Sequence, residues 1–152
     1  MDIVEESKTL SAICVLPTYN EKNTIAEIIE CIFELQNEIN NFTLKVLVVD
    51  DMSPDGTGDI VLGLMKKYQN LSLIQGAKMG LGAAYIRGIR EAIDKLGADV
   101  IIQMDSDGQH DPNVIKNFLL LTSEYDVVIG SRFTEGGKVI DFSMWRLFLS
   151  LF

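Results

Sequence analysis

The sequence is poor in residue types on which several classes of protein depend. It holds two cysteines and one histidine among 152 residues. Two thiols are too few for a disulfide scaffold or a cysteine-based zinc site, so we expect Cys14 and Cys31 to be reduced core residues, as in a reducing compartment. The single histidine, His110, gives no support for a catalytic triad, and we interpret it as a hydrogen-bonding loop residue.

Basic charge and long apolar runs are also scarce. The formal net charge of -9 argues against broad electrostatic binding to nucleic acid. No apolar run is long enough to span a bilayer, and residues 1–8 are too acidic and polar for a signal peptide. The chain has no GxxxxGK[ST] loop, and no GxGxxG follows its first apolar run, which excludes a P-loop site and disfavours an ordinary dinucleotide fold.

What the sequence does contain is the composition of one globular domain, with 47% hydrophobic and 23% charged residues. Short apolar runs predict buried strands, and apolar residues at helical spacing predict helices between them. Pro17 is expected to stop the first strand, Thr24 with Glu27 to form a capping box, and Gly97 to be the C-cap of a helix. The expected strands are 12–16, 44–49, 71–75, 100–104 and 127–130, and the expected helices lie near 24–37, 57–68, 81–96 and 112–119.

This alternation of strands and helices predicts a parallel sheet covered on both faces. In such sheets, ligands bind at the carboxyl ends of the strands. The loops after the first, second, fourth and fifth expected strands therefore share one rim. Polar and charged side chains gather there: Tyr19, Glu21, Asp50, Asp51, Asp105, Asp107 and Arg132.

The turn after the fourth expected strand carries the strongest single signal. Asp105 and Asp107 stand one residue apart directly after an apolar run. Two carboxylates at this place are costly if buried and unpaired, and a shared hard cation with oxygen ligands would explain them. The alternative is an ordinary acidic loop in which Asp111 and Pro112 begin a helix, because D-x-D triplets are common.

Five segments in order resemble family 2 glycosyltransferases of the GT-A fold, and most closely those that act on dolichyl and other polyprenyl phosphates. The segments are 16–21, 48–57, 80–85, 104–112 and 129–133, and the likeness spans residues 12–146. It implies an α/β fold: a Rossmann-like, three-layer α/β/α arrangement with a mostly parallel sheet, truncated in its C-terminal part. The expected parts are a flexible arm (1–9), a nucleotide-sugar-binding domain (10–141) and the start of an apolar interfacial helix (142–152).

The resemblance implies an inverting, metal-dependent transfer of a hexose to a polyprenyl or dolichyl phosphate at the cytoplasmic face of a membrane. Mannose from GDP-mannose is the best-matched donor, and Mg²⁺ or Mn²⁺ the expected cofactor. Gly108 leaves UDP-glucose or UDP-GlcNAc open, and a non-catalytic nucleotide-sugar-binding module is a further alternative. We expect a chain that keeps the donor site, lacks part of the acceptor site, and lies on a membrane or pairs with another copy through its apolar end.

The resemblance also assigns roles to individual residues. Catalysis falls to Asp107 and Arg132, and the metal site to Asp105, Asp107 and Gln109. Alternatives stay open for Asp50 and Asp51 as a helix cap and for Arg132 as a surface ion pair. Lys78 and Arg87 are expected to solvate a loop and a helix face, with an approach to a diphosphate as the alternative. The residues expected to contact the nucleotide sugar are Pro17, Tyr19, Glu21, Val49, Asp51, Asp105, Ser106 and Arg132.

Overall fold

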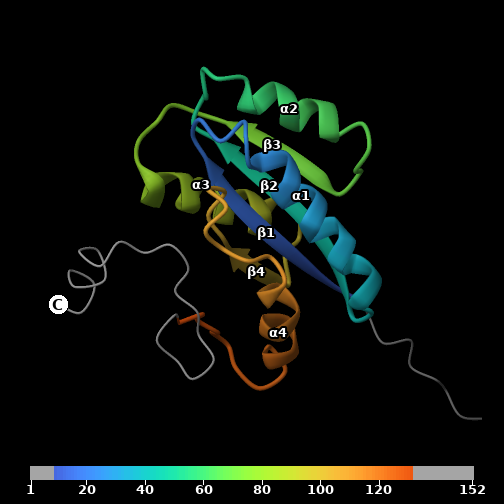
Figure 1. Cartoon of the computed structure of the whole chain (residues 1–152). Helices are drawn as coiled ribbons and strands as arrows, with labels where there is room; N and C mark the ends of the chain where they lie inside the picture. Colours follow the sequence, from blue (N-terminus) through green and yellow to red (C-terminus); the bar gives the residue numbers. More distant parts are fainter. Residues whose placement is uncertain (1–8, 132–152) are drawn as a thin grey trace, which may run out of the picture. The chain divides into compact units, whose positions relative to one another are not determined.

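A computed structural model of the chain describes residues 9–131 (Figure 1). The chain divides into two compact units, with the boundary after Asn117. The described part of the first unit holds the sheet and most of the helices, and the second unit begins within the last helix, α4 (Val114–Leu121). The domain limits expected from the sequence, at 9/10 and 141/142, stay predictions, since most of the arm and all of 132–152 lie outside the described residues.

Four parallel strands form the sheet of the first unit, in the spatial order β3-β2-β1-β4. This confirms the predicted α/β class with a parallel sheet. β1 pairs with β2 along its whole length, from Leu10 opposite Phe42 to Thr18 opposite Asp50, and with β4 over only four residues. The strands are β1 (Leu10–Thr18), β2 (Phe42–Asp50), β3 (Leu71–Gln75) and β4 (Val100–Gln103).

Helices cover the two faces of this sheet and give the predicted three layers. α1 (Ile25–Glu34), continued by the short 3₁₀ helix η1 (Leu35–Glu38), lies beside α2 (Thr57–Leu64) on one face. α3 (Leu81–Asp94) packs on β1 and β2 from the opposite face (Figure 1). α1 buries the apolar positions that recur at helical spacing: Ile25, Ile28, Ile29 and Ile32.

α3 approaches the sheet most closely at Gly88. A Cβ atom at this position would lie 2.5 Å from Cγ1 of Val15 and 2.7 Å from Cγ2 of Val49. Both valines are fully buried and belong to one core cluster with Ala84 and Ala92 of α3. A residue without a side chain is thus what allows α3 to lie this close to the sheet.

Pro17 does not stop the first strand, and this expectation was wrong. β1 runs through it to Thr18. Val15 accepts a backbone hydrogen bond from Met104, so the odd-numbered residues of β1 direct their backbone groups toward β4. β4 has already ended at Gln103, so the N–H that proline lacks has no ladder partner to lose.

The expected capping box at the start of α1 does not form either. Thr24 occupies the N-cap position, but its side chain makes no capping hydrogen bond. The hydroxyl donates instead to the backbone carbonyl of Ser106, at 2.7 Å. A long-range contact has therefore displaced the local pattern. The expected C-cap at Gly97 was wrong by two residues: α3 ends at Asp94 and Lys95 is its C-cap, while Gly97, with a φ of +66°, lies in the turn that follows.

The strand expected at 127–130 is also wrong. In the described part of the second unit, residues 127–130 form no strand, and the side chains of Val127 and Ile129 are 74% and 83% exposed. A strand is stabilised by a paired neighbour and by burial of one face, and this segment has neither in the described structure. Within residues 9–131, no helix has the length and apolar character needed to cross a bilayer.

Candidate functional site

The strand order places a topological switch point between the carboxyl ends of β1 and β4. The chain passes from β1 outward to β2 and β3, and α3 then brings it back to β4 on the other side of β1. The connections leaving β1 and β4 therefore diverge, which is the topological switch point where open α/β sheets bind ligands. The loops that follow β1 and β4 carry most of the site residues expected from the sequence.

The loop after β1 is fastened to the loop after β2. Three consecutive backbone N–H groups of the first loop donate to side chains of the second, which leaves little freedom between the two loops. Asp55 also accepts from Thr57, and this hydrogen bond is the main reason why the pKa of Asp55 lies below its usual range. The three bonds are Asn20 to Ser53 Oγ (2.9 Å), Glu21 to Thr57 Oγ1 (3.0 Å) and Lys22 to Asp55 Oδ2 (3.1 Å).

Asp50, at the end of β2, is buried beneath the rim and holds neighbouring segments together through hydrogen bonds. Its carboxylate is fully buried, accepts from the hydroxyl of Ser53 at 2.5 Å and accepts from the side-chain amide of Gln75 at 2.9 Å. Gly58 makes room for the second bond, because a Cβ there would lie 2.8 Å from the amide nitrogen of Gln75. Asp50 thus ties the ends of β2 and β3 to the turn between β2 and α2.

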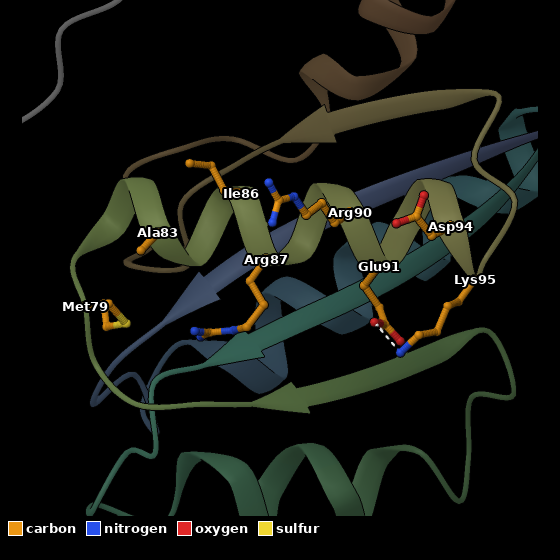
Figure 2. A pocket seen from close by; sticks show the side chains of 8 residues that line it. All are labelled: Met79, Ala83, Ile86, Arg87, Arg90, Glu91, Asp94 and Lys95. Atoms are coloured by element: carbon orange, nitrogen blue, oxygen red, sulfur yellow. Dashed lines mark ion pairs between the residues drawn. The ribbon is translucent and has the colours of Figure 1, made fainter.

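Asp51 is only 7% exposed and is paired with Arg87 of α3. Arg87 Nη2 lies 2.5 Å from Asp51 Oδ1. Figure 2 shows the Arg87 side chain leaving α3 on the side opposite Ile86 and reaching toward the end of β2. It crosses directly over Gly76, where a Cβ would lie 2.9 Å from Arg87 Cζ. Arg87 therefore orients an expected donor-site residue, whereas the sequence had suggested a solvated helix face.

Hydrogen bonds within the acidic turn after β4, and one from Tyr85 of α3, fix the conformation of this turn. Asp105 Oδ1 accepts from the hydroxyl of Tyr85, at 2.8 Å, and Asp107 Oδ1 accepts from the backbone of Gln109, at 2.9 Å. The backbone N–H of Asp105 donates to Nδ1 of His110, which confirms the interpretation of this histidine as a hydrogen-bonding loop residue. Gly108 has a φ of +80°, a conformation that glycine adopts without strain.

Ser106 joins the acidic turn to the loop after β1. This residue is 3% exposed, and its hydroxyl donates to the backbone carbonyl of Pro17, at 2.6 Å. Its own carbonyl accepts from the hydroxyl of Thr24. With Ser106 facing inward, Asp107 beside it is exposed and Asp105 is partly buried. These two hydrogen bonds hold the acidic turn against the end of β1 and the loop after it.

Glu21 lies on the same rim, and its pKa is raised. Partial burial is the largest cause, and the nearby carboxylates of Asp107 and Asp55 add to it, whereas a hydrogen bond from Thr24 opposes it. Beside it, Tyr19 is 37% exposed, with the ammonium group of Lys78 lying 3.3 Å from the centre of its ring. Lys78 thus faces the rim rather than only solvating its loop.

The remaining expected site residues are buried or outside the described part. Val49 is fully buried against α3 and is paired with Pro17 and Ile74 within the sheet. Pro17 offers its carbonyl to Ser106, and Arg132 lies outside the described residues. The sequence interpretation missed Tyr85 and Thr24 as parts of the site. Two signals pointed to Tyr85: it ends the segment 80–85 that resembles the family, and it has helical spacing with Gly88 and Ala92, three and seven residues later.

The donor chemistry of the acidic turn fits a hard divalent cation. Asp105 and Asp107 supply carboxylate oxygens, and the described hydrogen bonds use Oδ1 of each. Within residues 9–131, no cluster of three His, Cys, Asp or Glu side chains is placed to hold a metal. Two protein carboxylates, the Gln109 amide and phosphate oxygens of a ligand would complete the shell that Mg²⁺ or Mn²⁺ prefers.

A shallow depression lies elsewhere, on the outer side of α3 (Figure 2). It mixes both charges, with Glu91 and Lys95 paired at 2.8 Å, and Arg87 is the only site residue among those lining it. It contains none of the acidic turn. The candidate site is therefore the rim formed by the loops after β1 and β4.

The fold and the acidic, partly buried rim together define an α/β domain of the Rossmann type. The chain belongs to glycosyl transferase family 2, whose model matches residues 13–147. This agrees with the resemblance seen in the five sequence segments and confirms the GT-A class of fold.

Characterised relatives are similar over most of the chain. It is 34% identical to a dolichol-phosphate mannosyltransferase of Pyrococcus furiosus, over 90% of this chain and 37% of that protein. It is also 34% identical to an undecaprenyl-phosphate mannosyltransferase of Micrococcus luteus, over 93% of this chain and 56% of that protein. The chain thus spans roughly half or less of the length of the curated relatives it matches.

Solved structures show the same fold. A mannosyltransferase of Pyrobaculum calidifontis, in complex with GDP-Man and Mn²⁺, is 26% identical with a TM-score of 0.53, over 63% of this chain and 27% of that one. Mannosyl-3-phosphoglycerate synthase of Rubrobacter xylanophilus is 24% identical with a TM-score of 0.61, over 77% of this chain and 37% of that one. The second likeness concerns the fold alone.

Proposed function

We propose that this chain is the donor-binding part of an inverting hexosyltransferase that uses a divalent cation. The donor is a nucleoside-diphosphate hexose, best matched by GDP-mannose, and the acceptor is a polyprenyl phosphate. The observation that carries the proposal is the turn of Asp105 and Asp107 at the switch point, which Ser106 holds against the end of β1 and the loop after it. The names of the relatives, which are mannosyltransferases for polyprenyl phosphates, support the choice of sugar and acceptor.

The proposed reaction forms a bond between an acceptor phosphate oxygen and C1 of the sugar and breaks the bond from C1 to the nucleoside diphosphate. A bound cation supplies charge stabilisation for the departing diphosphate. Asp105, Asp107 and Gln109 would hold this cation. A phosphomonoester is largely ionised at neutral pH, so it attacks without a strong general base. This agrees with the role of His110, which closes the turn through its hydrogen bond to the Asp105 backbone.

The nucleoside would lie toward the ends of β1 and β2. Tyr19 offers an exposed ring, and Asp51, oriented by Arg87, offers a carboxylate oxygen to the ribose or base. Glu21 would contact the same part of the donor. Arg132 would bind phosphate oxygens through its planar guanidinium group. We further propose that the acceptor is met at the cytoplasmic face of a membrane, and that copies of the chain associate through the apolar segment 142–152.

Thermal-shift measurements with GDP-mannose, UDP-glucose and UDP-GlcNAc, each with Mn²⁺ or with a chelator, test the donor. We expect the largest stabilisation with GDP-mannose and Mn²⁺. Preference for a UDP-sugar would redirect the proposal to that donor class. Absence of any stabilisation would contradict it. Release of GDP that depends on added polyprenyl phosphate separates an enzyme from a module that only binds the nucleotide sugar.

Asp107→Ala tests the metal site directly. The exposed carboxylate of Asp107 is a proposed cation ligand, so its removal is expected to abolish the Mn²⁺-dependent part of the stabilisation. Asp94→Ala, an exposed carboxylate at the end of α3, is the matched control and is expected to leave that part unchanged. An unchanged Mn²⁺ effect in Asp107→Ala would remove this residue from the metal site.

A further inference from the structure

We propose that Tyr85 is a positioning residue for the cation: its hydroxyl fixes the Asp105 carboxylate in the orientation that presents Oδ2 to the ion. This inference rests on the proposed function, and it assigns a role to a residue of α3 that lies outside the acidic turn. The juxtaposition that carries it is the 2.8 Å hydrogen bond between Tyr85 Oη and Asp105 Oδ1.

The direction of this hydrogen bond follows from its partners. An ionised carboxylate has no proton to give, so the tyrosine hydroxyl donates. A tyrosine hydroxyl is protonated at neutral pH, so it is available as the donor there. With Oδ1 occupied, the rotation of the carboxylate is restricted and Oδ2 is the oxygen left to meet a cation. A ligand already oriented loses less conformational freedom on binding.

The position of the hydroxyl is itself set by the core. The Tyr85 ring packs against the cluster that includes Val15, Val49 and Ala84. One turn later, Gly88 brings α3 into the closest contact that the sheet allows. The ring thus belongs to a helix that packs closely on β1 and β2, whereas Asp105 lies in a turn. A fixed donor acting on a loop carboxylate is the arrangement that orients metal ligands in proteins.

Tyr85→Phe removes the hydroxyl and keeps the ring. Removing a hydrogen-bond partner of a metal ligand typically lowers metal affinity by about 10- to 100-fold, so we expect the Mn²⁺ dissociation constant to rise about tenfold. The measurement is titration of the chain with Mn²⁺, followed by the electron paramagnetic resonance signal of the free ion. Tyr68→Phe is the matched control, because Tyr68 is also partly buried but stacks on Phe33, away from the turn.

A readout that does not involve the metal separates positioning from general damage. Guanosine carries no phosphate, so its affinity, measured by ligand-observed NMR in chelator, should be the same in wild type and Tyr85→Phe. A parallel loss of guanosine binding overturns the proposed role. Equal Mn²⁺ affinity in wild type and Tyr85→Phe also overturns it and leaves the proposed function standing. Failure of the wild-type chain to bind Mn²⁺ at all contradicts the proposed function itself.

A measurement on the Tyr85-containing chain covers the case in which Tyr85→Phe does not fold. In the Tyr19→Phe variant, which removes the other tyrosine of the rim, Mn²⁺ alone should change the ultraviolet absorbance of tyrosine. The reason is that the cation alters the hydrogen-bond acceptor of Tyr85. A flat difference spectrum at saturating Mn²⁺ would contradict the inference.

Discussion

Glu21 is partly buried on a rim that it shares with other carboxylates, and this burial gives it a pH-dependent role in stability. Its pKa lies above the ordinary value of 4.5 in the folded chain, mainly through partial burial. The folded state therefore holds its proton more tightly than the unfolded state does. The stability contributed by this group is present below pH 4.5 and is lost as the pH rises through the raised pKa.

Glu21→Gln removes this loss and keeps an acceptor for the Thr24 hydroxyl. We expect the melting temperature in metal-free buffer at pH 7 to rise by about 1–2 °C, a small value because Glu21 is partly solvated. The difference should shrink as the pH falls below 4.5. Glu34→Gln, an exposed carboxylate on α1, serves as the control. A drop in the neutral-pH melting temperature of Glu21→Gln would contradict this interpretation.

Individual rim residues were predictable to the extent that they follow a strand. Tyr19, Asp51 and Asp105 all come directly or nearly directly after apolar runs, and the rule for parallel sheets places them together. Arg87, Tyr85 and Thr24 come from helices, and their partners lie far away in sequence. Only the crossing of α3 over the sheet brings Arg87 to Asp51 and Tyr85 to Asp105, and a sequence pattern does not encode that crossing.

At the scale of helices and strands, the sequence patterns failed to predict element ends where a contact with a distant segment determines them. The apolar runs predicted β3 over its full length and the centres of β1 and β2. The limits of β1 were wrong because Pro17 faces the side where β4 has ended, and a proline is tolerated there. The capping box failed because the Thr24 hydroxyl binds Ser106 instead. Local signals thus predicted the elements, and long-range partners determined their ends.

The close packing of α3 on the sheet at Gly88 leads to a second prediction. Gly88→Ala would place a Cβ under 3 Å from two buried valine methyl groups, so α3 must shift away from the sheet. We expect the free energy of unfolding to fall by about 1–3 kcal/mol, the usual result of overpacking a core. Because the shift would also move the Tyr85 hydroxyl, Mn²⁺ affinity should fall with it. Denaturant unfolding and Mn²⁺ titration measure the two effects.

Gly63→Ala is the matched control, and it should act in the opposite direction. Gly63 also lies within a helix, α2, but nothing lies within 4 Å of a Cβ built there. Alanine is the better helix former, so we expect the unfolding free energy to rise by about 0.5–1 kcal/mol. The same sign of change in both variants would show that helix propensity, and not the close packing at Gly88, controls this site.

At the scale of the whole molecule, charge decides how a nucleotide is bound. The chain carries a formal net charge of -9, and its candidate site gathers carboxylates. A diphosphate brings further negative charge to the same rim. Lys22, Lys78 and Arg87 are cations described near it; Lys22 faces Asp55, and Arg87 is already paired with Asp51. A doubly charged ion between carboxylates and phosphates is then the main source of compensation.

This balance predicts different cation requirements for two related ligands. GDP should bind at least tenfold more tightly with Mn²⁺ than in chelator, because the ion offsets the repulsion between its diphosphate and the acidic turn. Guanosine, which has the same base and ribose but no phosphate, should bind equally in both conditions. Calorimetry or ligand-observed NMR on the same preparation provides the comparison. If GDP bound as tightly in chelator as in Mn²⁺, the carboxylates of Asp105 and Asp107 would not face the diphosphate, and the proposed placement of the donor would have to be abandoned.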